Sequence, residues 1–362
     1  MNRVSGLALA AALISAGTVQ AAGIERAVPT TRALFEEGRY LEFSATWADP
    51  ELSGAGGTAL VPGIGAIPAA PAGTGDIFDS FATLGFAYKA DLTERWSYAF
   101  IVDQPWGVDT TYPTSPGVYS NVIARLDATQ VTGILAYDAT DRVKVYGGLR
   151  AERISASADL PFVRGYTVET DTQTNLGYMV GAAYQIPDIA FRVALTYYSA
   201  IEHEMNTTEF GVFETQTDIE TPQAVNLEFQ TGVAEDTLVF GSIRWVDWSE
   251  FVIRPPNYPL GTLVDYEEDW ITYTLGVGRK FSETWSGVAQ VSHEPATNTV
   301  LTTLGPVDGR TSLGLGATWT QGSVSVTGGV NYTWLGEAEN LLGTEFSDGS
   351  ALGLGVRVAY RF

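Results

Sequence analysis

The last twelve residues of the chain, Ala351 to Phe362, read ALGLGVRVAYRF. Every second residue from Leu352 to Phe362 is apolar, and glycine, alanine or arginine fills the positions between them. A period of two puts the two sets on opposite faces of a β-strand. A strand between lipid and a polar lumen has this pattern. A strand of a soluble β-sandwich has it too, so the choice depends on the rest of the chain.

Fourteen segments of the chain are plausible strands, at residues 40–47, 80–90, 95–105, 124–138, 142–154, 173–186, 190–203, 222–233, 237–250, 269–281, 285–295, 310–321, 323–335 and 351–362. Six short turns and seven long segments separate them in strict alternation. An even strand number with this asymmetry is typical of bacterial outer-membrane barrels. The sequence therefore predicts an all-β fold, a transmembrane antiparallel up-and-down β-barrel of about 14 strands with both termini at the short-turn end.

Aromatic residues gather near the ends of the expected strands. Near the short turns lie Trp96, Phe281, Trp285, Trp319 and Phe362, and near the long segments lie Trp106, Trp248, Trp270 and Trp334. Two aromatic belts are expected where a barrel wall crosses the two membrane interfaces. A soluble β-sandwich explains the alternation but not the turn asymmetry together with these belts.

The first residues, Met1 to Ala22, contain Arg3 as the sole charge, then an apolar stretch, and end in small residues. This pattern is typical of a cleaved secretory signal peptide, which we expect over residues 1–21. No later stretch resembles a transmembrane helix, so insertion into a membrane requires strands closed into a barrel, because an open edge leaves backbone amides unpaired in lipid. We expect the barrel over residues 40–362, in the bacterial outer membrane.

The composition excludes several function classes. The chain has no cysteine, hence no disulfide and no thiolate site. Its formal net charge of −22 argues against nucleic acid, which needs a basic patch. The acidic balance suits a surface that faces outer-membrane lipid, lipopolysaccharide and its divalent cations. The middle of the first long segment, Gly54 to Gly75, carries no charge; it is either a hydrophobic landing surface for a solute or a flexible linker.

Several motifs resemble the long-chain fatty acid transporter (FadL/TodX-type) family of outer-membrane channels. They are Asp103-Gln104-Pro105-Trp106-Gly107, Tyr146-Gly147-Gly148-Leu149-Arg150, Glu220-Thr221-Pro222-Gln223-Ala224-Val225-Asn226-Leu227 and Arg244-Trp245-Val246-Asp247-Trp248-Ser249. The resemblance covers roughly residues 80–362. It implies a fourteen-stranded barrel with an N-terminal plug that passes long-chain fatty acids or aromatic hydrocarbons without nucleotide hydrolysis.

The N-terminal region departs from the family pattern. Members usually carry a longer plug with an Asn-Pro-Ala segment, and this chain has no such motif before its first strand. The resemblance therefore implies at most a short plug or hatch segment over residues 22–39.

The resemblance also implies a lateral exit beside the kinked third strand. Here that strand runs into Pro105 and Gly107. Proline removes a ladder donor and glycine permits a bend, so both are candidates for a break in the wall. The alternative is that Pro105 simply ends the strand.

A channel for fatty acids needs an apolar slot for the tail and a cation for the carboxylate. Alternation places Arg150, Arg192 and Arg244 on the lumenal face, and these are the candidate carboxylate ligands. Phe240 and Trp248 point inward by the same parity and are candidates for the slot. The competing interpretation is that lumenal glutamates pair with the arginines and hold the interior together.

An enzyme is not expected. His203 and His293 are the only histidines, neither lies in a nucleophile motif, and surface positions explain them. We expect no cofactor and no metal site, because the acidic clusters lack a defined ligand spacing. Passive uptake of hydrophobic compounds, most of all long-chain fatty acids, is the predicted function. A general porin for small hydrophilic solutes is the alternative, and an adhesive barrel that transports nothing is the third.

Overall fold

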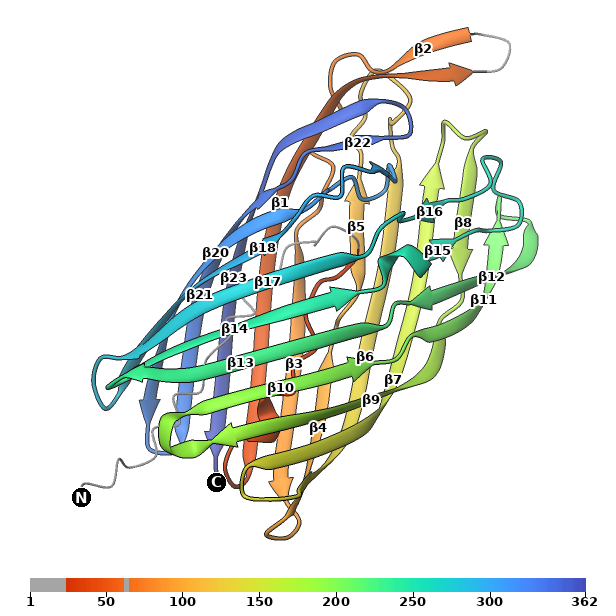
Figure 1. Cartoon of the computed structure of the whole chain (residues 1–362). Helices are drawn as coiled ribbons and strands as arrows, with labels where there is room; N and C mark the ends of the chain where they lie inside the picture. Colours follow the sequence, from red (N-terminus) through yellow and green to blue (C-terminus); the bar gives the residue numbers. More distant parts are fainter. Residues whose placement is uncertain (1–23, 62–64) are drawn as a thin grey trace.

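The computed structural model describes residues 24–61 and 65–362. It shows a closed antiparallel β-barrel (Figure 1). The barrel wall consists of fourteen strands, which we call staves to distinguish them from the shorter strands of the loops. In chain order these are β1 (Tyr40–Val61), β3 (Phe81–Asp91), β4 (Trp96–Asp103), β6 (Ile123–Asp138), β7 (Val143–Leu160), β9 (Gln173–Ile186), β10 (Phe191–Tyr198), β13 (Ala224–Ala234), β14 (Thr237–Val246), β17 (Trp270–Lys280), β18 (Trp285–Glu294), β20 (Arg310–Gln321), β21 (Val324–Leu335) and β23 (Thr344–Arg361). The predicted fold class and strand number are confirmed.

The barrel closes where the first stave meets the last. β1 pairs with β23 from Tyr40↔Arg361 to Gly56↔Thr344 and with β3 along its other edge. Because every stave has a neighbour on both sides, the ladder hydrogen bonds have partners around the whole wall. None of the helices within the described residues is long and apolar enough to span a membrane.

The side chains on the outside of the barrel follow the predicted alternation. Leu84 of β3, Leu149 of β7 and Leu195 of β10 are exposed. The residues on either side of each leucine in the same stave are small, polar or charged. The same holds for β23, where Leu354 and Val356 are exposed and Leu354 is paired with the exposed Val330 of β21. The outward face is therefore a continuous apolar band, as a lipid-facing wall requires.

The structure contradicts one of the two interpretations of the first long segment, which were a hydrophobic landing surface and a flexible linker. β1 does not end near residue 47 but continues to Val61, and β2 (Gly65–Ala70) folds back on it, for example at Thr58↔Pro68. The hairpin projects from the end of the barrel opposite to the C-terminus (Figure 1). Its backbone also pairs with β23, as at Gly54↔Phe346. The flexible-linker interpretation is therefore wrong for the described residues, because ladder hydrogen bonds fix this part of the chain.

Other long segments also contain strands that the sequence did not predict. They are β5 (Gly107–Thr111), β8 (Tyr166–Thr170), β11 (Ile201–Glu209), β12 (Phe213–Thr221), β15 (Val252–Ile253), β16 (Val264–Asp265), β19 (Val300–Leu301) and β22 (Ala338–Asn340). The seventh expected strand, 190–203, is two elements, because β10 leaves its neighbour β13 at Tyr198 and β11 pairs with β12 and β8 instead. Three short 3₁₀ helices complete the described secondary structure: η1 (Arg32–Phe35), η2 (Pro187–Ile189) and η3 (Trp248–Glu250).

The segment before β1, residues 24–39, lies inside the barrel. Its side chains and backbone contact staves on several sides of the lumen, namely β3, β7, β10, β13, β14 and β23. Near the short-turn end, Glu36 binds Arg361 of β23, and Arg32 binds Glu36 and Glu42. These ion pairs tie the base of the segment to the wall beside the closing seam.

Candidate functional site: two cavities, the segment between them and a break in the wall

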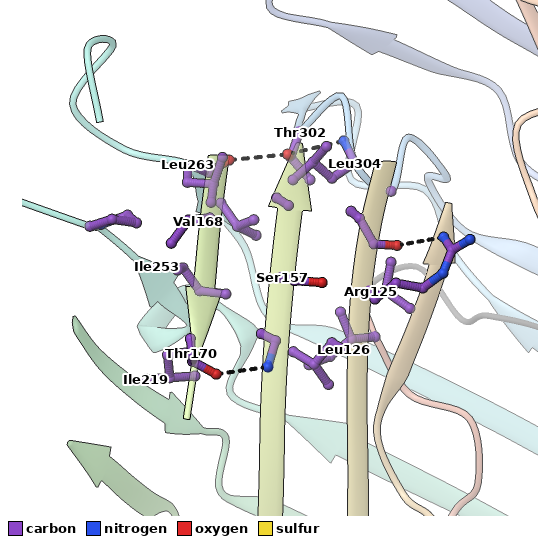
Figure 2. A pocket seen from close by; sticks show the side chains of 18 of the residues that line it. Arg125, Leu126, Ser157, Val168, Thr170, Ile219, Ile253, Leu263, Thr302 and Leu304 are labelled. Carbon is purple, nitrogen blue, oxygen red and sulfur yellow. Dashed lines mark hydrogen bonds between the residues drawn. The ribbon is translucent and has the colours of Figure 1, made fainter. Parts of the chain in front are cut away.

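An apolar pocket opens near the long-loop end of the barrel, which is the extracellular end in outer-membrane barrels. It has about 700 Å³ of empty space including its mouth. Figure 2 shows Leu126, Ile219, Ile253 and Leu304 among the side chains that line it. They come from β6, β12, β15 and the segment before β20, so parts of the chain far apart in sequence form one apolar wall.

Arg125 is the one charged residue among those lining this pocket. Its guanidinium is turned away from the pocket centre in Figure 2. Nη1 donates to the Thr110 carbonyl oxygen at 2.7 Å, and Nη2 donates to the Asp79 carboxylate at 2.7 Å. The cationic head is therefore already used by protein groups, and the described pocket wall offers no free charge.

Buried aromatic rings adjoin this pocket, and Trp248 is at their centre. Its ring centroid lies 5.4 Å from Tyr266, 5.4 Å from Trp270, 5.6 Å from Phe251 and 5.6 Å from Trp106. Phe251 and Tyr266 also line the pocket. We call these five residues the aromatic cluster. Edge-to-face packing at these separations is the favoured arrangement of aromatic rings.

The burial of the aromatic cluster contradicts the prediction that its tryptophans form an interfacial belt. Trp106, Trp248 and Trp270 are buried in the lumen and are not part of an interfacial belt. Trp106 lies in the break between β4 and β5, Trp248 lies in η3, and Trp270 begins β17 on its lumenal face, so proximity to a long loop did not place them in the membrane interface. Trp334 is exposed on the lipid side, as predicted. The inward position predicted for Trp248 agrees with its burial.

A second cavity lies deeper in the lumen, with about 1790 Å³ of empty space including space open to solvent. Its lining carries charged residues, namely Arg32, Arg244, Arg357, Glu42 and Glu228, beside apolar ones such as Val28, Phe86 and Ile101. Wall residues Thr83, Leu84, Gly85 and Gln104 line the same cavity. It therefore extends from the lumen to the barrel wall at β3 and β4.

The N-terminal segment separates the two cavities. Ile24 lines the upper pocket and Arg26 lines the lower cavity, with Glu25 between them. The Glu25 carboxylate accepts hydrogen bonds from Arg244 Nη2 at 2.5 Å and Nε at 3.0 Å. Glu25 also forms a backbone bridge with Trp106. The segment therefore contributes side chains to the lining of both cavities.

The three predicted carboxylate ligands are all in the lumen, and each has protein partners. Arg244 binds Glu25 and donates to Asn226 at 2.6 Å. Arg150 donates to the Ser199 carbonyl oxygen at 2.8 Å and to Gln130 at 3.1 Å. Arg192 donates to Gln230 at 2.9 Å and stacks on the Phe35 ring at 4.1 Å. The structure does not bring them together into one site.

The remaining predicted slot residue, Phe240, is buried on β14, with its ring over Gly276. It lines neither of the two cavities. The sequence did not single out the residues of the upper pocket. Most of them are small or aliphatic side chains on hairpins beyond the barrel wall, and alternation within one strand says nothing about how such hairpins meet.

His203 is not a surface residue, contrary to expectation, whereas His293 is exposed. The Nε2 atom of His203 lies 3.1 Å from the Glu152 carboxylate. The same carboxylate accepts hydrogen bonds from Trp106 Nε1 at 2.9 Å, Gln130 at 2.8 Å and Thr221 at 2.7 Å. This network fixes the wall beside Trp106. Among the described residues, no three acidic or histidine side chains are grouped as a metal site requires.

Pro105 interrupts the third stave without ending it. β4 pairs with β6 up to Asp103↔Gln130, and β5 resumes the pairing at Gly107↔Asp127. Residues 104–106 thus lie opposite 128 and 129, which is a β-bulge with one extra residue. The Pro105 carbonyl oxygen accepts a hydrogen bond from the Arg26 backbone N–H at 2.7 Å. The bulge turns the backbone toward the lumenal segment.

The bulge leaves the neighbouring stave unpaired over part of its length. β3 pairs with β4 only from Phe86↔Val102 to Asp91↔Ser97, so residues 81–85 have no ladder partner on that side. Gln104 Oε1 accepts a hydrogen bond from the Leu84 backbone N–H at 2.8 Å. Because Leu84 and Gln104 also line the lower cavity, the unpaired stretch of wall borders the lumen directly.

Comparison with known proteins agrees with this architecture. Residues 72–362 match the model of the family described as outer membrane protein transport protein (OMPP1/FadL/TodX). The chain belongs to this family. It is therefore an OMPP1/FadL/TodX protein of the bacterial outer membrane, and the predicted family and location are confirmed. No curated protein sequence matches the chain.

Solved OMPP1/FadL/TodX structures share the fold at low sequence identity. A FadL homologue of Pseudomonas aeruginosa superimposes with a TM-score of 0.75 at 13% identity, covering 91% of each chain. The Pseudomonas putida toluene transporter TodX gives 0.66 at 12% identity over 96% of each chain. The Ralstonia pickettii toluene transporter TbuX gives 0.60 at 14% identity over 91% of each chain.

Proposed function

We propose that this OMPP1/FadL/TodX protein is a passive channel that takes up neutral hydrophobic molecules about the size of a monoaromatic hydrocarbon. The observation that carries the proposal is the upper pocket, with its aliphatic and aromatic lining and no free charge among the described residues. A pocket of this composition binds a solute by burying its apolar surface. It gives no compensation for the desolvation of a carboxylate.

The similar solved structures support the same substrate class. TodX and TbuX are toluene transporters, and a further structure of the same fold is a monoaromatic hydrocarbon channel, CymD. The rings of the aromatic cluster suit a flat apolar solute, because offset and edge-to-face contacts add to the burial of apolar area.

The path proposed here runs from the upper pocket past Glu25 into the lower cavity and out through the wall. In it, residues 24–39 act as a short plug. The unpaired stretch of β3 at residues 81–85 and the bulge at Pro105 act as the lateral exit, and the lower cavity reaches both. Lateral release favours a hydrophobic solute, because the membrane is a better solvent for it than the aqueous periplasm.

Long-chain fatty acids are the second candidate substrate. The observation that favours them is the lower cavity, whose lining includes Arg244 and Arg357. Both arginines already bind carboxylates of the protein, Glu25 and Glu42. A fatty acid must therefore compete with these pairs. For a general porin, the lumenal segment would be an obstacle to ions and hydrophilic solutes.

Uptake measurements test the proposal. Cells that lack their own hydrophobic-compound channel would be given this protein and supplied with radiolabelled toluene or oleate. We expect faster toluene uptake, which falls at least fivefold in a Leu304→Trp variant that fills the upper pocket. Leu313→Trp on the exposed outer face is the matched control and should leave uptake unchanged. Uptake of oleate but not toluene would replace this proposal by the fatty-acid one.

A further inference from the structure

The three threonine hydroxyls of the upper pocket fall into two classes. Thr170 is engaged, because its Oγ1 accepts from the Ala156 N–H at 2.9 Å and donates to the Asp171 carbonyl oxygen at 2.9 Å. Thr302 Oγ1 donates to the Leu263 carbonyl oxygen at 3.3 Å and accepts from the Leu304 N–H at 3.3 Å. Thr217 also lines the pocket, but its hydroxyl oxygen is shielded from solvent and has no hydrogen-bond partner among the described residues.

Thr217 is only 2% exposed, so its hydroxyl has given up water without receiving a protein partner in exchange. Buried polar groups are nearly always paired, and an exception calls for an explanation. Alternation on β12 turns Thr217 and Ile219 to the same, buried side, and both line the pocket. A ligand that enters the pocket and displaces the side chains covering this oxygen would supply the missing partner.

Tyr266 supplies a second hydroxyl at the same pocket. Its ring is buried in the aromatic cluster, and its oxygen lies beside Gly305, another lining residue. No hydrogen bond of this hydroxyl is present within the described part of the chain. Burial raises the pKa of Tyr266. The phenol is therefore neutral at ordinary pH and available as a hydrogen-bond donor.

From this geometry we propose that the upper pocket selects hydrophobic molecules that carry one neutral oxygen, such as a phenol, an alcohol or a ketone, through the hydroxyls of Thr217 and Tyr266. The inference rests on the proposed function and narrows its substrate class. A threonine hydroxyl both donates and accepts, and a tyrosine hydroxyl does the same, so either end of a ligand hydroxyl finds a partner. A carboxylate finds no free cation in the described pocket wall, because Arg125 is already engaged.

The test compares two ligands that differ by a single hydroxyl, p-cresol and toluene. The purified full barrel in lipid nanodiscs would be dialysed to equilibrium against each radiolabelled compound, and partition into protein-free nanodiscs would be subtracted. One good neutral hydrogen bond changes affinity by roughly tenfold. We therefore expect p-cresol to bind about tenfold more tightly than toluene.

Variants identify the hydroxyls responsible. Thr217→Val keeps the shape of the side chain and is expected to reduce p-cresol affinity about fivefold while leaving toluene unchanged. Thr217→Ser should retain the preference, and Tyr266→Phe on top of Thr217→Val should abolish it. Thr170→Val is the matched control, because it removes an engaged hydroxyl of the same pocket, and it should keep the preference for p-cresol.

The outcomes separate this inference from the proposed function. Equal affinity for the two compounds in the unmodified protein would overturn the inference and leave the channel proposal intact. An equal loss for both ligands in Thr217→Val would also overturn it, since that result indicates packing alone. Failure of both compounds to bind, or binding unaffected by Leu304→Trp, would overturn the assignment of the upper pocket as the solute site.

Discussion

The guanidinium of Arg26 occupies the space in which residue 107 would carry a side chain, because a Cβ atom at Gly107 would overlap it. Arg26 starts in the lumenal segment and pairs with Asp109 and Asp127 of the wall. Its guanidinium also stacks on the Phe81 ring at 4.6 Å. Glycine at position 107 is therefore needed for the Arg26 guanidinium to lie close to the wall. Arg26 attaches the lumenal segment to the wall at the edge of the proposed exit, and we call this contact the latch.

A first prediction concerns this latch. Gly107→Ala should push Arg26 away from Asp109 and destabilise the barrel by about 2 kcal/mol, since inserting even one carbon into a packed site costs roughly 1–3 kcal/mol. The measurement is the urea midpoint of unfolding from lipid vesicles, followed by tryptophan fluorescence.

Gly133→Ala is the control for Gly107→Ala. Gly133 lies on the neighbouring stave β6, and a Cβ atom there meets nothing within 4 Å. This variant should unfold at the same urea concentration as the unmodified protein. If the two variants are equally stable, Arg26 moves aside at no cost and the latch has no energetic role.

The strands were predictable because their signal is local. Alternation within ten residues defines which side of a strand meets lipid, and this explains why the number of staves and the outward leucines agree with expectation. Strand ends were less predictable. β1 and β7 continue beyond the membrane-facing region as hairpins, and the polar or glycine-rich sequences of those hairpins carry no lipid-facing pattern.

The lumenal contacts were not predictable from the sequence. Glu25 and Arg244 are 219 residues apart, and no local pattern brings them together. The alternation of side chains along its strand predicted that Arg244 faces the lumen. Whether Arg244 binds a ligand or forms an internal ion pair could not be predicted without the position of the N-terminal segment. Trp270 is different: it begins β17 and alternates with the exposed Ile271, so the period of its own strand turns it inward.

A second prediction distinguishes two roles for Arg244. If it mainly anchors the N-terminal segment, Glu25→Gln and Arg244→Ala should both loosen that segment and change toluene and oleate uptake in the same direction. Removal of one partner of a buried ion pair typically costs about 3–5 kcal/mol. We also expect more frequent channel openings in planar bilayers for both variants.

If Arg244 instead binds a ligand carboxylate, Arg244→Ala alone should reduce oleate uptake and leave toluene uptake unchanged. Glu25→Gln would then raise oleate uptake, because it removes the competing carboxylate. That pair of results would favour the fatty-acid proposal over the one made here.

A third prediction tests the lateral exit. The chain has no cysteine, so a Leu84→Cys/Gln104→Cys pair can be cross-linked across the break with a short reducible dimaleimide without side reactions. Cross-linking should slow toluene uptake several-fold, and reduction of the linker should restore it. The control pair, Leu315→Cys/Val330→Cys, faces lipid across an intact ladder. Equal uptake by both cross-linked proteins would mean that solutes leave by another route.

A fourth prediction concerns the aromatic cluster as a size filter. Trp248 contacts Trp106, Phe251, Tyr266 and Trp270, so a smaller residue at this position opens space beside the boundary between the two cavities. Trp248→Leu should lower the free energy of unfolding by about 2–4 kcal/mol, as other large-to-small core changes do. It should also raise the uptake of naphthalene relative to toluene.

Trp334→Leu is the control variant for Trp248→Leu. Trp334 is a lipid-facing tryptophan, 49% exposed, so its replacement removes the same atoms without enlarging the lumen. We expect that variant to keep the naphthalene-to-toluene uptake ratio of the unmodified protein. A ratio that rises equally in both variants would trace the effect to a weakened barrel wall, and an unchanged ratio in Trp248→Leu would show that solute size is limited elsewhere along the path.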